Sequence, residues 1–319
     1  MPLKLVAVTD SVFPNLDPAR EVLAKIGAEV RLAEHVPRDA DAILTTYAKI
    51  SADLIQELKQ CRIIARFGIG VDNVDIPAAT NAGIVVTRVP DYCLDEVSDH
   101  TMALLLALVR KIPSSNARTQ GGKWEMRAVV PIHRLRGTVL GLVAFGQIPQ
   151  LVAPKAQSFG IRVVTYDPYV SKPVAERAGV EQVTFDELLK ISDYISIHTP
   201  LLPATRHLFN ADVFSRMKPT AYLINTARGP IIDEAALASA LDQGHLAGAA
   251  LDVMEQEPPS GSPLFGRDNV IVTPHTSFYS EESLVDLQTK AAEEVVRVLS
   301  GQTPKNPVNP EALKTAQSI

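Results

Sequence analysis

The chain has 319 residues, a formal net charge of -5 and 46% hydrophobic residues, which is typical of a globular protein with two domains. The acidic balance without a basic stripe argues against nucleic acid as a partner, and the longest apolar run (102–109) is too short to cross a membrane. Two cysteines, and a start that lacks the layout of a signal peptide, favour a cytoplasmic location and indicate no disulfide framework.

Short apolar runs alternate with helix-length segments along almost the whole chain, which predicts parallel βαβ units. Helices are expected near 18–26, at 96–111 and at 281–299, and the polar stretch 114–135 is interpreted as an arm. The tail from 301 to 319 is expected to lie over the surface. The expected strands are 3–8, 42–46, 63–65, 84–87, 139–145, 162–166, 194–198, 221–225, 249–252 and 270–273.

The segment 141–149 lies at a predicted strand-to-helix junction, and Asp167 ends the next expected strand. This context predicts a dinucleotide site, with the pyrophosphate facing the helix N-terminus and the carboxylate bonding a ribose. Pro168 and Tyr169 follow, rather than a basic residue, so the sequence favours NAD over NADP.

The glycine pattern of this loop is irregular, because Gly146 alone remains of the expected G-x-G-x-x-G. Ala144 and Pro149 stand at the other two glycine positions, and Pro154 lies where it would cost about 3 kcal/mol in a regular helix. A kinked structural helix without a ligand is the alternative interpretation.

Three segments in the last third of the chain combine a fixed cation, a carboxylate and an imidazole, namely Arg228, Glu257 and His275. Each residue follows an apolar run that predicts a strand, and the carboxyl ends of parallel strands meet at one edge of a sheet. The combination suits carbonyl reduction by hydride. Taken singly, each residue could equally be a turn residue, a paired arginine or a solvated loop charge. No cluster has the spacing of metal ligands, so no metal is expected.

Together these motifs resemble the D-isomer-specific 2-hydroxyacid dehydrogenases, the superfamily of formate and phosphoglycerate dehydrogenases. The segments 131–137 and 278–282 look closest to the branch of the C-terminal-binding proteins, NAD binders that act as corepressors. The resemblance covers nearly the full length and rests on segments 66–75, 97–108, 166–168, 225–229, 252–259 and 274–275.

The resemblance implies an α/β fold of two doubly wound parallel-sheet domains. A Rossmann NAD-binding domain (99–287) would be inserted into a discontinuous flavodoxin-like substrate domain (1–98 and 288–319). It also implies a homodimer, with the arm at the interface.

Residue roles follow from the resemblance. Arg228 would grip the substrate, His275 would act as acid and base, and Glu257 would assist it. The residues expected at the substrate are Tyr47, Lys49, Ile69, Gly70, Arg228 and Phe278. The residues expected to contact NAD are Gly146, Gln147, Ile148, Asp167, Thr199, Thr226, Ala227, Asp252 and Ser277.

Some assignments stay open at this point. Asp252 either orients the nicotinamide amide or caps a turn, and Lys49 either meets a second anionic group or is solvated. His100, His198 and His207 are expected to be structural, the last two alternatively lying beside the adenosine.

The resulting prediction is an NAD-dependent oxidoreductase acting on a small D-2-hydroxy acid or 2-oxo acid. The alternative is an NAD(H)-gated binding protein, like the corepressors, without significant turnover.

Overall fold

The computed structural model describes residues 3–315, and the chain divides into two compact units. Unit 1 comprises the residues up to Cys93 and those from Tyr279 onward, while unit 2 runs from Leu94 to Phe278. The sequence placed these boundaries at 98/99 and 287/288, and its substrate domain included residues 1–2 and 316–319, which lie outside the described residues. Each unit holds one parallel sheet with helices around it, so the predicted fold class is confirmed.

Unit 1 is built on a sheet of order β2-β1-β3-β4-β5, the order of flavodoxin-like folds. Strands β1, β3, β4 and β5 are buried throughout, as expected for a parallel sheet covered on both faces. Its elements are β1 (Leu5–Val8), α1 (Asp17–Ala24), β2 (Glu29–Leu32), β3 (Ala42–Thr45), α2 (Ala52–Glu57), β4 (Ile63–Arg66), α3 (Ile76–Asn81), β5 (Val85–Thr87), α11 (Glu281–Leu299) and α12 (Ala312–Thr315).

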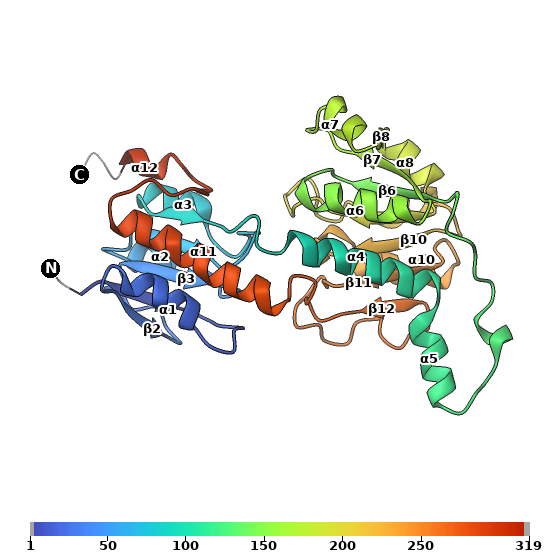
Figure 1. The fold of residues 1–319 in the computed structure, drawn as a ribbon, viewed down its shortest axis with the longest axis horizontal. Coiled ribbons are helices and arrows are strands. Elements are labelled where there is room, and N and C mark those ends of the chain that lie inside the picture. Colours follow the sequence, from blue (N-terminus) through green and yellow to red (C-terminus); the bar gives the residue numbers. More distant parts are fainter. Residues whose placement is uncertain (1–2, 316–319) are drawn as a thin grey trace. The chain divides into compact units, whose positions relative to one another are not determined.

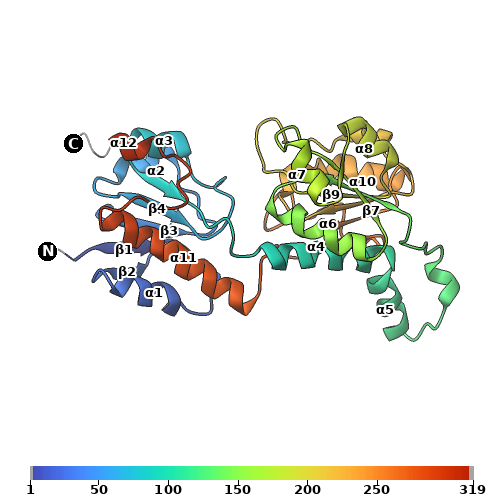
Figure 2. The same ribbon diagram turned by 45° about the horizontal axis from the view of Figure 1, so that its top comes forward.

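Helices α1 and α11 lie side by side on this sheet (Figures 1 and 2). Helices α2 and α3 contribute Ile55 and Ala79 to a cluster with the strand residues Ile43 and Ile64. The chain from 301 to 315 is more firmly packed than the surface tail that the sequence predicted for 301–319, of which residues 316–319 lie outside the described residues. Asn309 is fully buried and its side chain accepts a hydrogen bond from the backbone N–H of Val86 at 2.7 Å.

Unit 2 is built on a sheet of order β12-β11-β10-β9-β6-β7-β8, in which every pair of neighbours is parallel. Its helices are α4 (Leu94–Val109), α5 (Ile112–Gln120), η1 (Met126–Val129), α6 (Gln147–Ser158), α7 (Lys172–Arg177), α8 (Phe185–Ile191), α9 (Ala211–Arg216), η2 (Gly229–Ile231) and α10 (Glu234–Asp242). Its strands are β6 (Val139–Val143), β7 (Arg162–Tyr166), β8 (Glu181–Gln182), β9 (Tyr194–Ile197), β10 (Tyr222–Asn225), β11 (Gly248–Leu251) and β12 (Val270–Val272).

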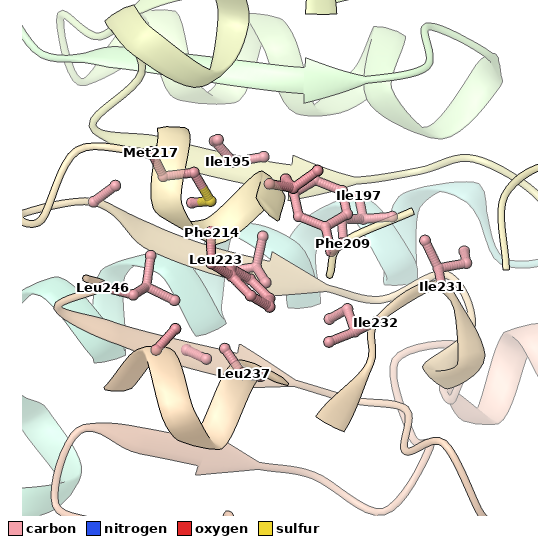
Figure 3. Packing of buried hydrophobic residues seen from close by; sticks show 14 of the residues in the cluster. Ile195, Ile197, Phe209, Phe214, Met217, Leu223, Ile231, Ile232, Leu237 and Leu246 are labelled. Atoms are coloured by element: carbon pink, nitrogen blue, oxygen red, sulfur yellow. The ribbon is translucent and has the colours of Figure 1, made fainter. Parts of the chain in front are cut away.

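Two hydrophobic clusters hold unit 2 together. One joins α4 and α6 to the strands, with Leu105 and Val152 among its buried residues. The other joins α8, α9 and α10 to the sheet, and in Figure 3 the side chains of Phe214, Ile195 and Leu223 lie together in it. The two clusters account for strands that read as continuous apolar runs rather than alternating ones.

The predicted arm contains α5 and η1, which extend away from the sheet of unit 2 in both views (Figures 1 and 2). Neither element has a buried residue, and Trp124 and Met126 are 90% and 76% exposed. Among residues 3–315, no helix combines the length and the apolar character needed to cross a bilayer.

Several elements differ from the sequence prediction. Strands β2 and β8 were not predicted, because β2 is mostly exposed and β8 has two residues, so neither forms an apolar run. Helix α6 continues through Pro154, although an internal proline favours a break. Helix α11 has the predicted bounds, and a capping box of Ser280 and Ser283 marks its start.

Candidate active site

The carboxyl ends of the unit 2 strands bring most of the predicted site residues to one edge of the sheet. The chain runs from β6 to β7 and β8 on one side and from β9 to β12 on the other, so the switch point lies between β6 and β9. Ligands of open α/β sheets bind at this point. Gly146, Asp167 and Thr199 follow β6, β7 and β9, in the part of the edge nearest to it.

The start of α6 has the features of an anion site. Gly146 is the N-cap, and no side chain caps the first turn, which contains Gln147 and Ile148. A Cβ atom added to Gly146 would meet nothing within 4 Å, so the space in front of the helix is open. Backbone N–H groups at a helix N-terminus favour a phosphate, and these residues therefore fit the pyrophosphate of a dinucleotide.

Asp167 connects this loop to the end of β7. Its Oδ2 accepts a hydrogen bond from the Phe145 N–H at 2.8 Å, and its Oδ1 accepts one from the Tyr169 N–H at 2.8 Å. The residue is 7% exposed. A carboxylate has about four acceptor positions, so these bonds leave capacity for a ribose hydroxyl.

The turn after β10 presents Arg228. Asn225 shapes it, because its side chain donates to the Arg228 carbonyl and accepts from the Ala227 N–H, both at 2.9 Å. The neighbouring Thr226 hydroxyl lies 3.0 Å from that of Thr101 on α4. These contacts hold the loop while the Arg228 guanidinium reaches back to donate to the Ala227 carbonyl at 2.7 Å.

Gly229 brings the next loop close to this turn. A Cβ atom at this position would lie 1.8 Å from the Met254 carbonyl oxygen, so a side chain could not be accommodated without moving backbone. The loops after β10 and β11 therefore pack backbone to backbone.

Glu257 and His275 are in direct contact. The Nδ1 atom of His275 lies 2.6 Å from Oε2 of Glu257, and the other carboxylate oxygen accepts the Met254 N–H at 2.9 Å. A carboxylate partner makes Nδ1 the protonated nitrogen, which leaves Nε2 to exchange a proton. The side chains are 22% and 34% exposed, so a ligand can reach the pair.

Asp252 holds the turn that carries His275. Its carbonyl accepts the His275 N–H at 2.8 Å, and its carboxylate accepts the Thr276 and Ser277 N–H groups, both at 2.9 Å. The Thr273 hydroxyl donates to the same carboxylate, whose side chain is inaccessible to solvent. The sequence left open whether Asp252 orients the nicotinamide amide or caps a turn. These bonds favour the turn cap, and a contact of Asp252 with NAD stays a prediction.

Two further histidines lie near this edge, and the ring of each contacts a hydroxyl group. His100 on α4 places Nε2 at 3.1 Å from the Thr273 hydroxyl. His198, after β9, places Nε2 at 2.9 Å from the Ser196 hydroxyl, and burial lowers its pKa from 6.5 to about 3. His198 is therefore neutral at physiological pH.

Unit 1 carries four of the predicted substrate residues, whereas Phe278 is the last residue of unit 2. Tyr47 and Lys49 lie in the loop after β3, and Ile69 and Gly70 lie in the loop after β4. Tyr47 is 44% exposed. Asn73 ties the two loops together, because its side chain donates to the Ala48 carbonyl at 2.8 Å.

Asp10 was not among the predicted site residues, and it lies at the switch point of unit 1 between β1 and β3. Its carboxylate accepts the N–H groups of Thr46 (2.9 Å) and Tyr47 (2.6 Å) and the hydroxyl of Thr9 (2.7 Å). The available signal was an acidic residue just beyond the first expected strand.

The sequence also gave no signal for the contact of His207 with Glu255. Within residues 3–315, no group of three or more His, Cys, Asp or Glu residues could hold a metal ion.

Comparison with known proteins gives consistent matches. A family model described as "D-isomer specific 2-hydroxyacid dehydrogenase, NAD binding domain" matches residues 102–277. The D-3-phosphoglycerate dehydrogenase of Methanocaldococcus jannaschii is 40% identical over 314 residues, covering 95% of this chain and 59% of that protein. The chain thus spans less than two thirds of that relative.

Solved structures match over nearly their whole length. A protein from Thermus thermophilus has a TM-score of 0.86 and 36% identity, covering 95% of this chain and 99% of that one. The D-lactate dehydrogenase from Aquifex aeolicus, complexed with NAD and lactic acid, has a TM-score of 0.88 and 28% identity, covering 96% and 99%.

Proposed function

We propose that the chain interconverts a small D-2-hydroxy acid and the corresponding 2-oxo acid. The premise is that the chain belongs to the D-isomer-specific 2-hydroxyacid dehydrogenase family and carries its NAD binding domain. The cofactor is NAD. The observation that carries the proposal is the contact between His275 and Glu257 at the strand ends of this domain.

His275 is the acid and base of the proposed reaction. NADH, when bound, supplies the hydride that adds to C2 of the oxo acid. The Nε2 atom of His275 then gives a proton to the carbonyl oxygen, and in the reverse direction it removes the hydroxyl proton. Glu257 accepts the Nδ1 hydrogen of His275 and so keeps the ring oriented.

Arg228 binds the substrate carboxylate in this proposal. A guanidinium stays charged at all relevant pH values and can form two parallel hydrogen bonds with a carboxylate. The packed turn from Asn225 to Gly229 fixes the backbone that carries the Arg228 side chain.

The remaining assignments follow from the same premise. Unit 2 is the nucleotide domain and unit 1 the substrate domain. Tyr47, Lys49, Ile69 and Gly70 of unit 1 and Phe278 of unit 2 contact the substrate in this proposal. A cytoplasmic homodimer is part of the proposal, and the exposed Trp124 of the arm supports the arm as its interface.

The test uses purified protein with NADH and a panel of 2-oxo acids that includes pyruvate and glyoxylate. Turnover is followed by nicotinamide absorbance.

His275→Asn suits the left-handed backbone at this position and should lower kcat by about 10²–10⁴-fold while NADH binding is kept. Arg228→Lys should mainly weaken substrate binding, because lysine lacks the fork. The exposed His35 provides a control, and His35→Asn should change neither property. Normal turnover by His275→Asn would contradict the acid and base assignment.

The alternative is an NAD(H)-gated binding protein akin to the C-terminal-binding proteins, and the placement near that branch stays a prediction. Its support is the phosphate loop, where Ala144 adopts a left-handed backbone with φ of 79°. NADH binding without turnover of any oxo acid would favour this alternative.

A further inference from the structure

His207, Glu255 and Glu234 form a compact charged group in unit 2, here called the His207 cluster. Nε2 of His207 lies 2.6 Å from Oε1 of Glu255. The Glu255 N–H donates to the Glu234 carboxylate at 2.5 Å, and the Glu234 N–H donates to the Glu255 carboxylate at 3.3 Å. The Ser262 hydroxyl also donates to Glu234, at 3.0 Å. None of these residues belongs to the proposed catalytic set.

The cluster joins the loops that carry Arg228 and Glu257. Glu234 begins α10, shortly after the Arg228 turn, and Glu255 lies in the loop after β11. The backbone N–H of His207 donates to the Pro230 carbonyl at 2.9 Å, and Phe209 forms a bridge with Ile232. His207 therefore attaches to the Arg228 loop through its backbone and to the Glu257 loop through its ring.

A short path leads from the cluster to Glu257. Met254, the residue before Glu255, donates its N–H to the Glu257 carboxylate, and the carbonyl of Met254 packs against Gly229. A shift of the backbone at Glu255 would therefore move the donor that orients the partner of His275.

The backbone of His207 is itself unusual. Its φ is 50°, a left-handed conformation that costs free energy for residues other than glycine. Strain of this kind persists where surrounding contacts impose it, and it is often found at functional sites. Here the imposing contacts are those with Pro230 and Glu255.

We propose that the His207 cluster positions Glu257, and through Glu257 the His275 ring, for proton transfer. The inference rests on the proposed function. His207 and Glu255 are positioning residues, since they act through Met254 and Glu257 and not on the substrate.

The test is a double-mutant cycle in the full-length protein with NADH and whichever of pyruvate and glyoxylate the wild type reduces faster. Glu255→Gln and His207→Asn remove the contact between imidazole and carboxylate, and asparagine tolerates the left-handed backbone of His207. Each should lower kcat on the order of tenfold, with the KM for NADH unchanged, because the α6 loop is elsewhere on the sheet edge.

The decisive comparison repeats Glu255→Gln in a Glu257→Gln background. If Glu255 acts through Glu257, the second substitution should have almost no further effect on kcat. A purely structural role predicts equal losses of kcat in both backgrounds, and that result would overturn the inference. Asp242→Asn is the matched control, since it breaks the exposed pair with Arg267 at the other end of α10 and should leave kcat unchanged.

The outcomes also separate the two proposals. A wild type that binds NADH but reduces no oxo acid overturns the proposed function and, with it, this inference. An active wild type with additive losses overturns the inference alone.

Discussion

Left-handed backbone conformations mark the candidate site at the scale of single residues. Besides His207, both Ala144 in the phosphate loop and His275 have a positive φ, 79° and 53°. Glycine adopts this region without the steric penalty that a Cβ brings. Ala144 therefore carries strain at a position where the dinucleotide fingerprint has its first glycine.

Replacing Ala144 by glycine should relieve this strain. We expect Ala144→Gly to raise the free energy of unfolding by up to about 1 kcal/mol. The change removes the penalty of a left-handed alanine, and the greater conformational entropy of glycine in the unfolded chain offsets part of this gain. Urea unfolding followed by circular dichroism measures the change. The exposed Ala117 in α5 is the control, because Ala117→Gly in a regular helix should cost about 1 kcal/mol. An equal loss in the free energy of unfolding for Ala144→Gly and Ala117→Gly would contradict the assignment of strain to Ala144.

Asp10 should make the stability of unit 1 depend on pH. Burial alone would raise the pKa of this carboxyl group, but hydrogen bonds from the Tyr47 and Thr46 N–H groups and the Thr9 hydroxyl outweigh it and lower the pKa below 3.8. A carboxylate with a lowered folded-state pKa stabilises the fold above the unfolded-state value, and this contribution is lost as the pH falls through the folded-state pKa.

Asp10→Asn should accordingly lower the free energy of unfolding by roughly 1–2 kcal/mol at pH 7, because asparagine cannot accept these bonds as an anion. The difference from the wild type should shrink as the pH falls below about 4. Urea titrations at pH 7 and pH 3.5 measure both values, with Asp39→Asn as an exposed control. A difference that stays constant over this range would show that the Asp10 charge contributes nothing.

At the scale of elements, the strand ends and helix starts determine what each loop can bind. Helix α6 starts at an uncapped glycine with open space before it, which suits an anion. The loops after β10, β11 and β12 carry Arg228, Glu257 and His275 on adjacent strands. Helix α6 also contains Pro154, which lacks the N–H that would bond the Gln150 carbonyl.

Pro154→Ala should stabilise α6. The residue is exposed, so the change removes no core packing, and it restores a hydrogen bond in the helix interior. We expect a gain of about 1–3 kcal/mol in the free energy of unfolding, measured by urea titration. Pro173, near the start of α7, provides the comparison, because proline is tolerated in a first turn and Pro173→Ala should bring little gain. A loss of stability in Pro154→Ala would show that α6 is adapted to its proline.

At the scale of the whole molecule, the two units differ in continuity. Unit 2 is one uninterrupted stretch with its own sheet and clusters. Unit 1 is assembled from both ends of the chain, and α11 packs against α1, β3 and β4. Folding of unit 1 therefore requires segments that are distant in sequence.

A fragment of residues 94–278 should fold alone, because it contains every element of its sheet. We expect one cooperative urea transition and binding of NADH, measured by fluorescence. A fragment of residues 1–93 should remain unfolded, because it lacks the apolar face of α11. Failure of the first fragment to fold would show that unit 2 depends on the rest of the chain.

Sequence reasoning reached the fold class because each strand of a covered parallel sheet is a local apolar run, and each helix follows in order. It reached Arg228, Glu257 and His275 because their position after strands is also local information. The contact of His275 with Glu257 follows from the adjacency of β11 and β12, although the catalytic role of the pair stays a prediction. Exposed β2 and short β8 leave no such local signal.

The sequence by itself determined the alternating α/β architecture, the cofactor loop and the order of the candidate catalytic residues along the strand ends. Only the tertiary structure decided the left-handed backbone of Ala144, the Asp10 contacts with the loop after β3 and the grouping of His207 with Glu255 and Glu234. The physical reason is the distance in sequence between the residues that interact. Apolar periodicity and turn chemistry act between near neighbours in sequence, whereas a hydrogen-bonded charge depends on partners that only the packed sheet brings within about 3 Å.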